Sequence, residues 1–293
     1  MTKVVRVGDV LIGGGNKIAV QSMTNTVTKN ADATSAQINA LTDVGCDIVR
    51  VAVADAADAE ALGDIKKRIK VPLVADIHFD YRLAVAAVRN GADKIRINPG
   101  NIGSDEGLKK IISAAKERGV AIRIGVNGGS LGKDILARFG NTAAALAESA
   151  LEYVRRFEDM GFDNIVLSVK SSDVRKTVDA CRILAKECDY PQHIGVTESG
   201  SGESARVKSA IGIGALLLDG IGDTIRVSLT DNPVEEVLFA KEILRAVGKD
   251  KNYCEVISCP SCGRCGINLI AVAQEIKEYV KDIKKPMKIA VMG

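Results

Sequence analysis

The feature that most constrains the fold of this chain is an alternation, repeated eight times, of short β-branched runs with helical stretches. The runs are IAVQSM (18–23), CDIVRVAV (46–53), PLVADIHF (72–79), KIRINPG (94–100), AIRIGVN (121–127), NIVLSVK (164–170), QHIGVTE (192–198) and TIRVSL (224–229). Between them, stretches such as 105–119 and 232–248 carry apolar residues at the three- and four-residue spacing of helices. Eight strand–helix units predict an α/β protein with a parallel (β/α)8 TIM barrel. The alternative is a doubly wound open sheet, which is disfavoured because no Gly-x-Gly-x-x-Gly follows the first run.

The length of the chain indicates how many structural units it can form, and its charge indicates which classes of partner to expect. The chain has 293 residues, enough for a barrel of roughly 250 residues and a small second unit, and we expect residues 1–250 and 251–293 to form them. Lys plus Arg number 40 against 37 Asp plus Glu, without a run of like charge, so no nucleic acid or membrane partner is expected. The sequence lacks a span of roughly 18 apolar residues and a signal peptide. We therefore expect a cytoplasmic protein.

Charged residues interrupt strands that should be apolar on both faces if the sheet is parallel. Counting every second residue, one face carries Arg50, Asp76, His78, Arg96, Asn98, Arg123, Asn127, Ser168, Lys170, Glu198, Arg226 and Ser228. For any single one of these, a side chain that reaches solvent is the simpler explanation, but seven strands agree. Most of the residues lie toward the C-terminal half of their strand, where barrel enzymes keep their active sites. Five bases against two acids predict a bowl that binds a small polyanion, and guanidinium groups favour phosphate.

Cysteines cluster after residue 250, where the pattern changes to a strand, a cysteine turn, an amphipathic helix, Pro286 and another strand. The clustered residues are Cys254, Cys259, Cys262 and Cys265. Both zinc and iron–sulfur sites use Cys-x2-Cys turns, and the spacing leaves both open. The other cysteines lie in helix or strand patterns and are expected to be buried as apolar residues: Cys46, Cys181 and Cys188.

Several long segments carry a resemblance to a known family. They are AVQSMTNT (19–26), VPLVADIHFDYRLA (71–84), IRINPGNIG (95–103), IRIGVNGGSL (122–131), GIGDTIRVSL (220–229) and SCPSC (258–262). Together they resemble the bacterial 4-hydroxy-3-methylbut-2-enyl diphosphate synthases, iron–sulfur enzymes of the non-mevalonate isoprenoid pathway that depend on ferredoxin or flavodoxin. The likeness runs from about residue 4 to the last residue.

The resemblance implies an activity and a set of site residues. The barrel would bind 2-C-methyl-D-erythritol 2,4-cyclodiphosphate, and a reductive ring opening would remove a hydroxyl group as water with two electrons. The family's substrate-binding residues match Arg50, Arg96, Asn98, Arg123, Asn127, Lys170, Arg226 and Ser228. The acidic partners match Glu198, for which we hypothesise proton donation to the leaving hydroxyl, and Asp76, which would orient the substrate or share that proton. The resemblance also implies a homodimer.

The resemblance further implies a C-terminal ferredoxin-like α+β domain with a [4Fe-4S] cluster. Three cysteines and a glutamate hold the cluster in the family, and the first two cysteines match Cys259 and Cys262. The third cysteine and the glutamate are expected beyond Gly293, so the cluster domain is expected to be incomplete in this chain and the chain itself inactive. Cys265 departs from the family's ligand pattern, and neither it nor Cys254 is assigned a role.

Two other classes of protein explain part of the sequence. A metal-free barrel enzyme, of the pterin-condensing or phosphosugar type, would also need a basic bowl but gives no reason for the cysteine turn. A zinc or iron–sulfur sensor would use the turn but gives no reason for charged residues along seven strands. Iron and sulfide analysis separates these classes.

Overall fold

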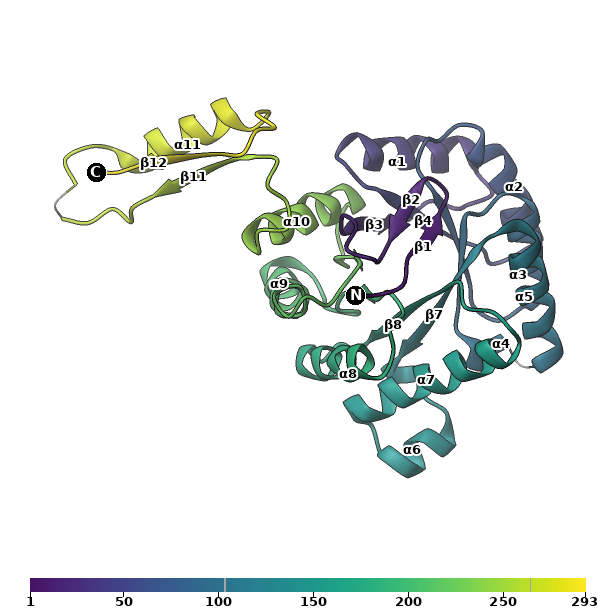
Figure 1. The fold of residues 1–293 in the computed structure, drawn as a ribbon. Helices are drawn as coiled ribbons and strands as arrows, with labels where there is room; N and C mark the ends of the chain where they lie inside the picture. The colour runs from purple at the N-terminus through teal and green to yellow at the C-terminus, as the bar shows by residue number, and fades with distance from the viewer. Residues whose placement is uncertain (103, 264) are drawn as a thin grey trace. The chain divides into compact units, whose positions relative to one another are not determined.

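Eight parallel strands form the central sheet of the first of two units, Met1–Ile243 (Figure 1). The computed structural model describes residues 1–102, 104–263 and 265–293. The strands are β3 (Ala19–Met23), β4 (Ile48–Ala52), β5 (Leu73–Ile77), β6 (Lys94–Ile97), β7 (Ala121–Asn127), β8 (Ile165–Lys170), β9 (His193–Ile194) and β10 (Thr224–Ile225). Each lies within one of the eight predicted runs.

The sheet closes on itself. Its strand order is β8-β7-β6-β5-β4-β3-β10-β9. An additional parallel bridge joins Leu167 of β8 to Gln192, next to β9, and the Leu167 N–H donates to the Pro191 carbonyl at 2.9 Å. The predicted TIM barrel is confirmed, and the open sheet is wrong because the two ends of the strand order are paired.

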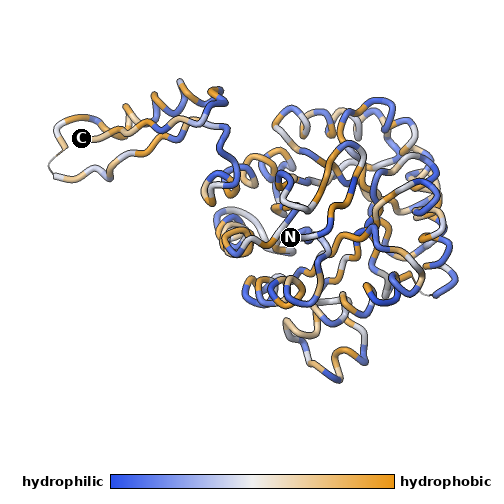
Figure 2. Tube along the Cα trace, viewed as in Figure 1, coloured by the Kyte–Doolittle hydropathy of each residue, from blue (hydrophilic) through white to orange (hydrophobic). Residues whose placement is uncertain are grey.

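One helix follows each barrel strand and covers the sheet (Figure 1). These helices are α1 (Ala31–Asp43), α2 (Ala56–Lys66), α3 (Tyr81–Arg89), α5 (Asp105–Arg118), α7 (Ala143–Asp159), α8 (Val174–Glu187), α9 (Gly202–Leu218) and α10 (Pro233–Ala246). Short helical segments occupy two of the loops: α4 (Pro99–Ile102), η1 (Gly128–Ser130) and α6 (Lys133–Phe139). Blue and orange alternate along the helices in Figure 2, as expected when each helix turns one face to the sheet. No helix in the described ranges is long and apolar enough to span a membrane.

Capping side chains start six of these helices directly after the strand-to-helix loops. In each case the side chain accepts a hydrogen bond from a backbone N–H of the first turn, which would otherwise lack a partner. The caps are Asn30, Asp55, Asp80, Ser104, Thr142 and Asp173. Each of these loops, which follow the C-terminal ends of the strands, therefore ends at a helix start that a capping hydrogen bond holds in place.

An antiparallel hairpin that the sequence analysis missed seals the N-terminal end of the barrel. It consists of β1 (Val5–Val7) and β2 (Val10–Ile12). Its apolar side chains pack in one cluster with residues at the starts of the strands, namely Ala19, Ile48, Val74, Ala121 and Val166. These apolar contacts close one end of the barrel, so the opposite, C-terminal end is the one available for a ligand.

The second unit, Leu244–Gly293, contains a strand–helix–strand motif. Its elements are β11 (Cys254–Ser258), α11 (Leu269–Val280) and β12 (Met287–Val291), with β11 and β12 parallel. Leu269, Ala273 and Val291 form a small core between helix and strands. The order strand, cysteine turn, helix, strand agrees with the sequence prediction. The predicted division between residues 250 and 251 stays a prediction.

Lys94 is a buried cation inside the barrel that the sequence analysis did not select. It starts β6, its side chain is fully buried, and its Nζ donates to Gln21 Oε1 at 3.3 Å. No carboxylate pairs with it among the described residues. Burial, with the charges of Arg123 and Arg50, holds the pKa of Lys94 well below its usual value of 10.5. The folded barrel therefore disfavours the protonated lysine.

We predict that Lys94→Met changes the pH dependence of stability. Because the pKa of Lys94 is lower in the folded than in the unfolded chain, the unfolded chain binds more protons below about pH 10.5, and wild-type stability falls as pH decreases from there. Methionine takes up no proton. The melting temperature of the variant minus that of wild type should therefore increase as the pH is lowered from 10.5 toward neutrality. Lys109→Met, an exposed position on α5, is the control. Parallel melting profiles for Lys94→Met and wild type would contradict the prediction.

Candidate functional site

The C-terminal ends of the barrel strands surround a cavity of about 280 Å³, here called the basic bowl. Ten of the twelve residues predicted on the bowl face line it: Arg50, Asp76, His78, Arg96, Arg123, Asn127, Ser168, Lys170, Arg226 and Ser228. Met23, Gly125 and Thr197 complete the lining. The charged part of the lining is five basic side chains and one carboxylate, with His78 beside them. This composition suits a ligand with several negative charges.

The strand period explains why these side chains meet in one cavity. Ile48 and Val74 face the hairpin at the floor of the barrel, and Arg50 and Asp76 stand two residues further along the same strands, so they face the same interior. On β7, Gly125 faces inward between Arg123 and Asn127. A Cβ atom at Gly125 would lie 2.7 Å from Arg96 Nε. The glycine therefore leaves room for the Arg96 side chain to cross the cavity.

Asp76 ties together the bases on the first strands of the bowl. Its Oδ1 lies 3.0 Å from an Arg96 guanidinium nitrogen, and its Oδ2 lies 3.6 Å from one of Arg50 and 3.5 Å from His78 Nε2. Burial opposes ionisation of this carboxyl, but the charges of Arg50, Arg96 and Arg123 and the His78 hydrogen bond outweigh it, and the pKa of Asp76 lies well below its usual range. Asp76 is therefore ionised at neutral pH. Burial and the neighbouring arginines lower the pKa of Arg50 to about 10, so Arg50 is charged as well.

Arg123 and Lys170 are the bases of the bowl whose positive charge has no carboxylate partner among the described residues. Arg123 is 2% exposed, and its Nε and one terminal nitrogen have no hydrogen-bond partner in the described chain. Lys170 is 7% exposed and forms no ion pair with any described residue. Burial lowers the pKa of Lys170, and the charges of Arg123, Arg226 and Arg50 lower it further. Buried donors of this kind need acceptors, and a bound anion would supply them.

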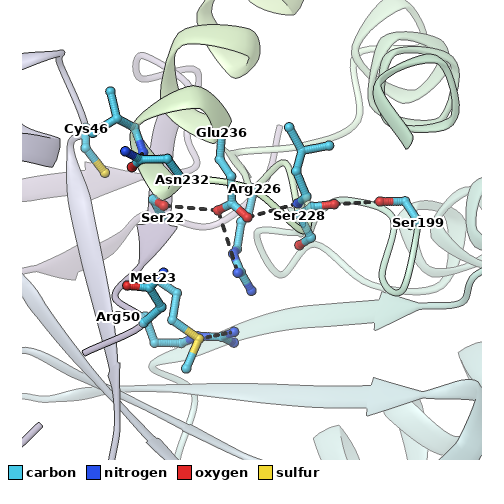
Figure 3. A network of polar contacts seen from close by, with 12 residues as sticks. Ser22, Met23, Cys46, Arg50, Ser199, Arg226, Ser228, Asn232 and Glu236 are labelled. Carbon is cyan, nitrogen blue, oxygen red and sulfur yellow. Dashed lines mark hydrogen bonds and ion pairs between the residues drawn. The ribbon is translucent and has the colours of Figure 1, made fainter. Parts of the chain in front are cut away.

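Arg226 is held by a carboxylate that the sequence analysis missed. Glu236 on α10 is 5% exposed and lies 3.7 Å from an Arg226 guanidinium nitrogen through Oε2. Figure 3 shows this carboxylate beside Ser22 and Arg226, and its other oxygen accepts a hydrogen bond from the Leu229 backbone N–H. No periodic signal marks Glu236, because an acidic residue in the first turn of a helix is ordinary. Arg50 on β4 directs two nitrogens at Met23 Sδ of the neighbouring strand β3, at 3.1 and 2.9 Å.

Two of the sequence-predicted residues lie outside the bowl lining, Glu198 and Asn98. Both follow the end of a strand, β9 at Ile194 and β6 at Ile97, where the two-residue period no longer fixes the direction of a side chain. Arg226 and Ser228, beyond the end of β10, nevertheless line the bowl. Glu198 is exposed and adopts φ 53°, which favours glycine. It lines an adjacent hollow that shares Asn127 and Thr197 with the bowl. Asn98 is buried, and its carbonyl accepts a hydrogen bond from the Asn101 N–H at 2.9 Å.

The cysteines divide into two groups. Cys46 and Cys181 are buried in the barrel unit, and burial raises the pKa of each thiol to about 12, whereas Cys188, also expected to be buried, is only half-buried. In the second unit, Cys259 packs partly against the small core while Cys262 is exposed. Within the described ranges, no group of three or more His, Cys, Asp or Glu residues is arranged to hold a metal ion. The thiols of the Cys-x2-Cys turn nevertheless suit soft iron in their donor chemistry.

Cys265 has a structural environment of its own. Its backbone N–H donates to the Cys262 carbonyl at 2.9 Å, and its Sγ lies 3.3 Å from the Ile267 carbonyl oxygen. A Cβ atom at Gly293 would lie 2.6 Å from this Sγ. The thiol is thus packed against the chain near β12.

We predict that Arg123→Leu weakens the binding of inorganic pyrophosphate. Arg123 offers two unpartnered buried nitrogens to an anion, and a hydrogen bond to a charged group contributes about 1.5–3 kcal/mol, so the dissociation constant should rise roughly 10- to 100-fold. Titration calorimetry measures it. Arg118→Leu, on the exposed face of α5, should bind as wild type does. Equal affinity of the Arg123 variant and wild type would remove Arg123 from the binding site.

Comparison with solved structures identifies chains of the same barrel fold. Dihydropteroate synthase from Stenotrophomonas maltophilia superposes with a TM-score of 0.60 at 14% identity, covering 84% of this chain and 98% of that one. The N-acetylneuraminic acid synthetase from Leptospira borgpetersenii superposes with a TM-score of 0.58 at 13% identity, covering 97% of this chain and 98% of that one. At these identities the similarity concerns the fold alone.

Comparison with sequences is far more specific. The chain is 55% identical over its whole length to the 4-hydroxy-3-methylbut-2-en-1-yl diphosphate synthase (flavodoxin) of Anoxybacillus flavithermus, covering 80% of that protein. It is 52% identical to the enzyme of that name from Bacillus subtilis, covering all of this chain and 78% of that protein. Residues 2–241 match the GcpE TIM-barrel domain and residues 255–293 the GcpE protein C-terminal domain. Because both of its parts match in the same order, the chain belongs to the GcpE family.

Proposed function

We propose that this protein opens the ring of 2-C-methyl-D-erythritol 2,4-cyclodiphosphate and reductively removes a hydroxyl group, giving 4-hydroxy-3-methylbut-2-enyl diphosphate in the non-mevalonate pathway. The reaction takes up two electrons and releases water. The flavodoxin in the names of the relatives supports flavodoxin as the electron donor. A homodimer and a cytoplasmic location belong to the same proposal.

The observation that carries this proposal is the set of buried, incompletely paired cations in the basic bowl. Five bases face one carboxylate there, and two nitrogens of Arg123 lack any described partner. A cyclic diphosphate carries phosphoryl oxygens that guanidinium groups can bind in pairs. Over 50% identity across the whole chain to proteins with this activity in their names makes the match specific.

The basic residues have binding roles in this proposal. Arg50, Arg96, Arg123, Lys170 and Arg226 bind the diphosphate and balance the charge that the leaving oxygen acquires as the ring opens. Asn127 and Ser228 add neutral polar contacts at the rim of the bowl. Asn98 follows β6 but lies outside the lining, so its proposed contact with substrate rests on the family resemblance.

The two acids have different roles. Asp76 is ionised and already binds two arginines and His78, so it orients the bases and does not donate a proton. Glu198 is proposed as the proton donor to the leaving hydroxyl. The Thr197 side of the lining is common to the bowl and the Glu198 hollow, and a substrate that extends from one into the other would bring its hydroxyl group near Glu198.

Cys259 and Cys262 would hold a [4Fe-4S] cluster in this proposal. Their thiolates and their Cys-x2-Cys spacing suit iron–sulfur ligation, and the backbone N–H of Cys259 is fixed by the Val291 carbonyl at 3.2 Å. When bound, such a cluster supplies electrons and a Lewis-acidic iron.

We predict that the complete gene product, reconstituted anaerobically, reduces the cyclodiphosphate with reduced flavodoxin, and that Glu198→Gln lowers turnover by about a hundredfold. Glutamine keeps the shape of the side chain but carries no acidic proton. Substrate affinity should change little, since Glu198 lies outside the bowl lining. Glu203→Gln, in the first turn of α9, is the control. A wild type that binds no cyclodiphosphate would refute the function, whereas normal turnover in the Glu198 variant would refute only the proton donor.

We further predict that Cys262→Ser, and likewise Cys259→Ser, prevents stoichiometric iron–sulfur binding, because a hydroxyl group is a poor ligand for soft iron. Iron and sulfide analysis and the absorption spectrum measure cluster content without an activity assay. Cys181→Ser, in the barrel unit, should leave the content of the complete gene product unchanged. Full cluster content in Cys262→Ser would show that Cys262 is not a ligand.

A further inference from the structure

Glu236 is a buried carboxylate that joins three parts of the barrel at the edge of the basic bowl (Figure 3). Its Oε2 accepts a hydrogen bond from Ser22 Oγ of β3 at 3.1 Å and lies 3.7 Å from Arg226. Its Oε1 accepts a hydrogen bond from the Leu229 backbone N–H at 2.9 Å. The carboxylate itself does not line the bowl, so it touches no ligand there.

The segment that Glu236 binds has little other support from the sheet. β10 contains two residues and ends at Ile225, directly before Arg226. The Arg226 backbone N–H donates to the Ile194 carbonyl at 3.0 Å, but the next stretch leads away from the sheet into α10. Two hydrogen bonds hold that stretch: the Ser228 carbonyl accepts one from Ser199 Oγ at 2.5 Å, and the Leu229 backbone N–H donates one to Glu236. The Arg226 guanidinium therefore depends on contacts from outside its strand.

We propose that Glu236 is a positioning residue: it fixes the Arg226 guanidinium in the orientation that binds the phosphoryl groups of the ligand. This inference rests on the proposed function only in taking the bowl as a polyanion site. The Arg226 Nε has no partner among the described residues, so part of the guanidinium is available to a ligand while Glu236 holds another part. Ser22 serves the same purpose by orienting the carboxylate.

Glu236 could act through its negative charge or by positioning Arg226, and these two roles predict opposite changes in anion affinity when the carboxylate is removed. If Glu236 acted only through its charge, neutralising it would strengthen anion binding, because one negative charge near the bowl would be lost. If Glu236 positions Arg226, neutralising it weakens anion binding, because the guanidinium loses its charge-assisted contact and its fixed orientation. The sign of the change in affinity therefore distinguishes the two roles.

The test measures inorganic pyrophosphate binding to the full chain by titration calorimetry. Glu236→Gln, which keeps the size of the side chain, should raise the dissociation constant by about tenfold. Ser22→Ala should raise it by a smaller factor in the same direction. Glu235→Gln, on the same helix and paired with Arg206 at 3.3 Å, is the matched control and should bind as wild type does.

A double variant separates action through Arg226 from any other route. Once Arg226→Met has removed the guanidinium, adding Glu236→Gln should not raise the dissociation constant further. Tighter binding by Glu236→Gln would assign Glu236 a charge role only. Unchanged affinity with a lower melting temperature would assign it a structural role only, and a further loss in the Arg226→Met background would show that it acts elsewhere. Each result overturns the positioning role, and wild type that fails to bind pyrophosphate would overturn the polyanion site together with it.

Discussion

Among the described residues that line the basic bowl, Asp76 is the one carboxylate facing five basic side chains. Its two oxygens are shared between Arg96 and Arg50 on neighbouring strands, and His78 also lies within 3.5 Å. Burying several cations in a barrel is costly unless they are paired. Asp76 offsets that cost for the bases of β4 and β6 and fixes the directions in which they point. Arg226 has its own carboxylate, Glu236 of α10. Arg123 and Lys170 lie between these two anchors without a described anionic partner.

The rest of the fold supports this arrangement by closing one end of the barrel and leaving the other open. The β1–β2 hairpin packs valine and isoleucine side chains against the starts of the strands, and the charged residues of the bowl lie further along, past the buried Lys94 that starts β6. Gly125 and Gly195 then make room for long side chains. A Cβ atom at Gly195 would lie 2.9 Å from Lys170 Nζ and 2.3 Å from the Arg226 carbonyl oxygen. Long cationic side chains thus fit into the barrel because two interior positions carry no side chain.

The sequence predicted the barrel and most of the bowl because both follow from a two-residue period. Arg50, Asp76 and Arg123 share the parity of the apolar residues Ile48, Val74 and Ala121 that pack with the hairpin, and that parity holds wherever the strand is regular. After a strand ends the parity is no longer dependable: Arg226 and Ser228 still line the bowl beyond β10, whereas Glu198 and Asn98, beyond β9 and β6, lie outside its lining. Glu236 was missed for a different reason. Glu236 lies on a helix beside the bowl. It contacts Arg226, ten positions earlier in the chain, across a loop whose course no local pattern predicts.

The excess of positive charge also affects what ligand binding does to the protein. Burial lowers the pKa of both Arg123 and Lys170, and the repulsion that they experience from one another and from the other bases lowers it further. A polyanion that enters the bowl gives these groups a partner, so it removes repulsion in addition to forming its own hydrogen bonds. Part of the binding free energy is therefore stored in the folded chain as electrostatic destabilisation, and a ligand that binds only the folded state raises stability by linkage. The dihydropteroate synthases share the barrel at 14% identity. At that identity the fold alone is shared, so the charges of the bowl follow from this chain's own residues and not from the barrel.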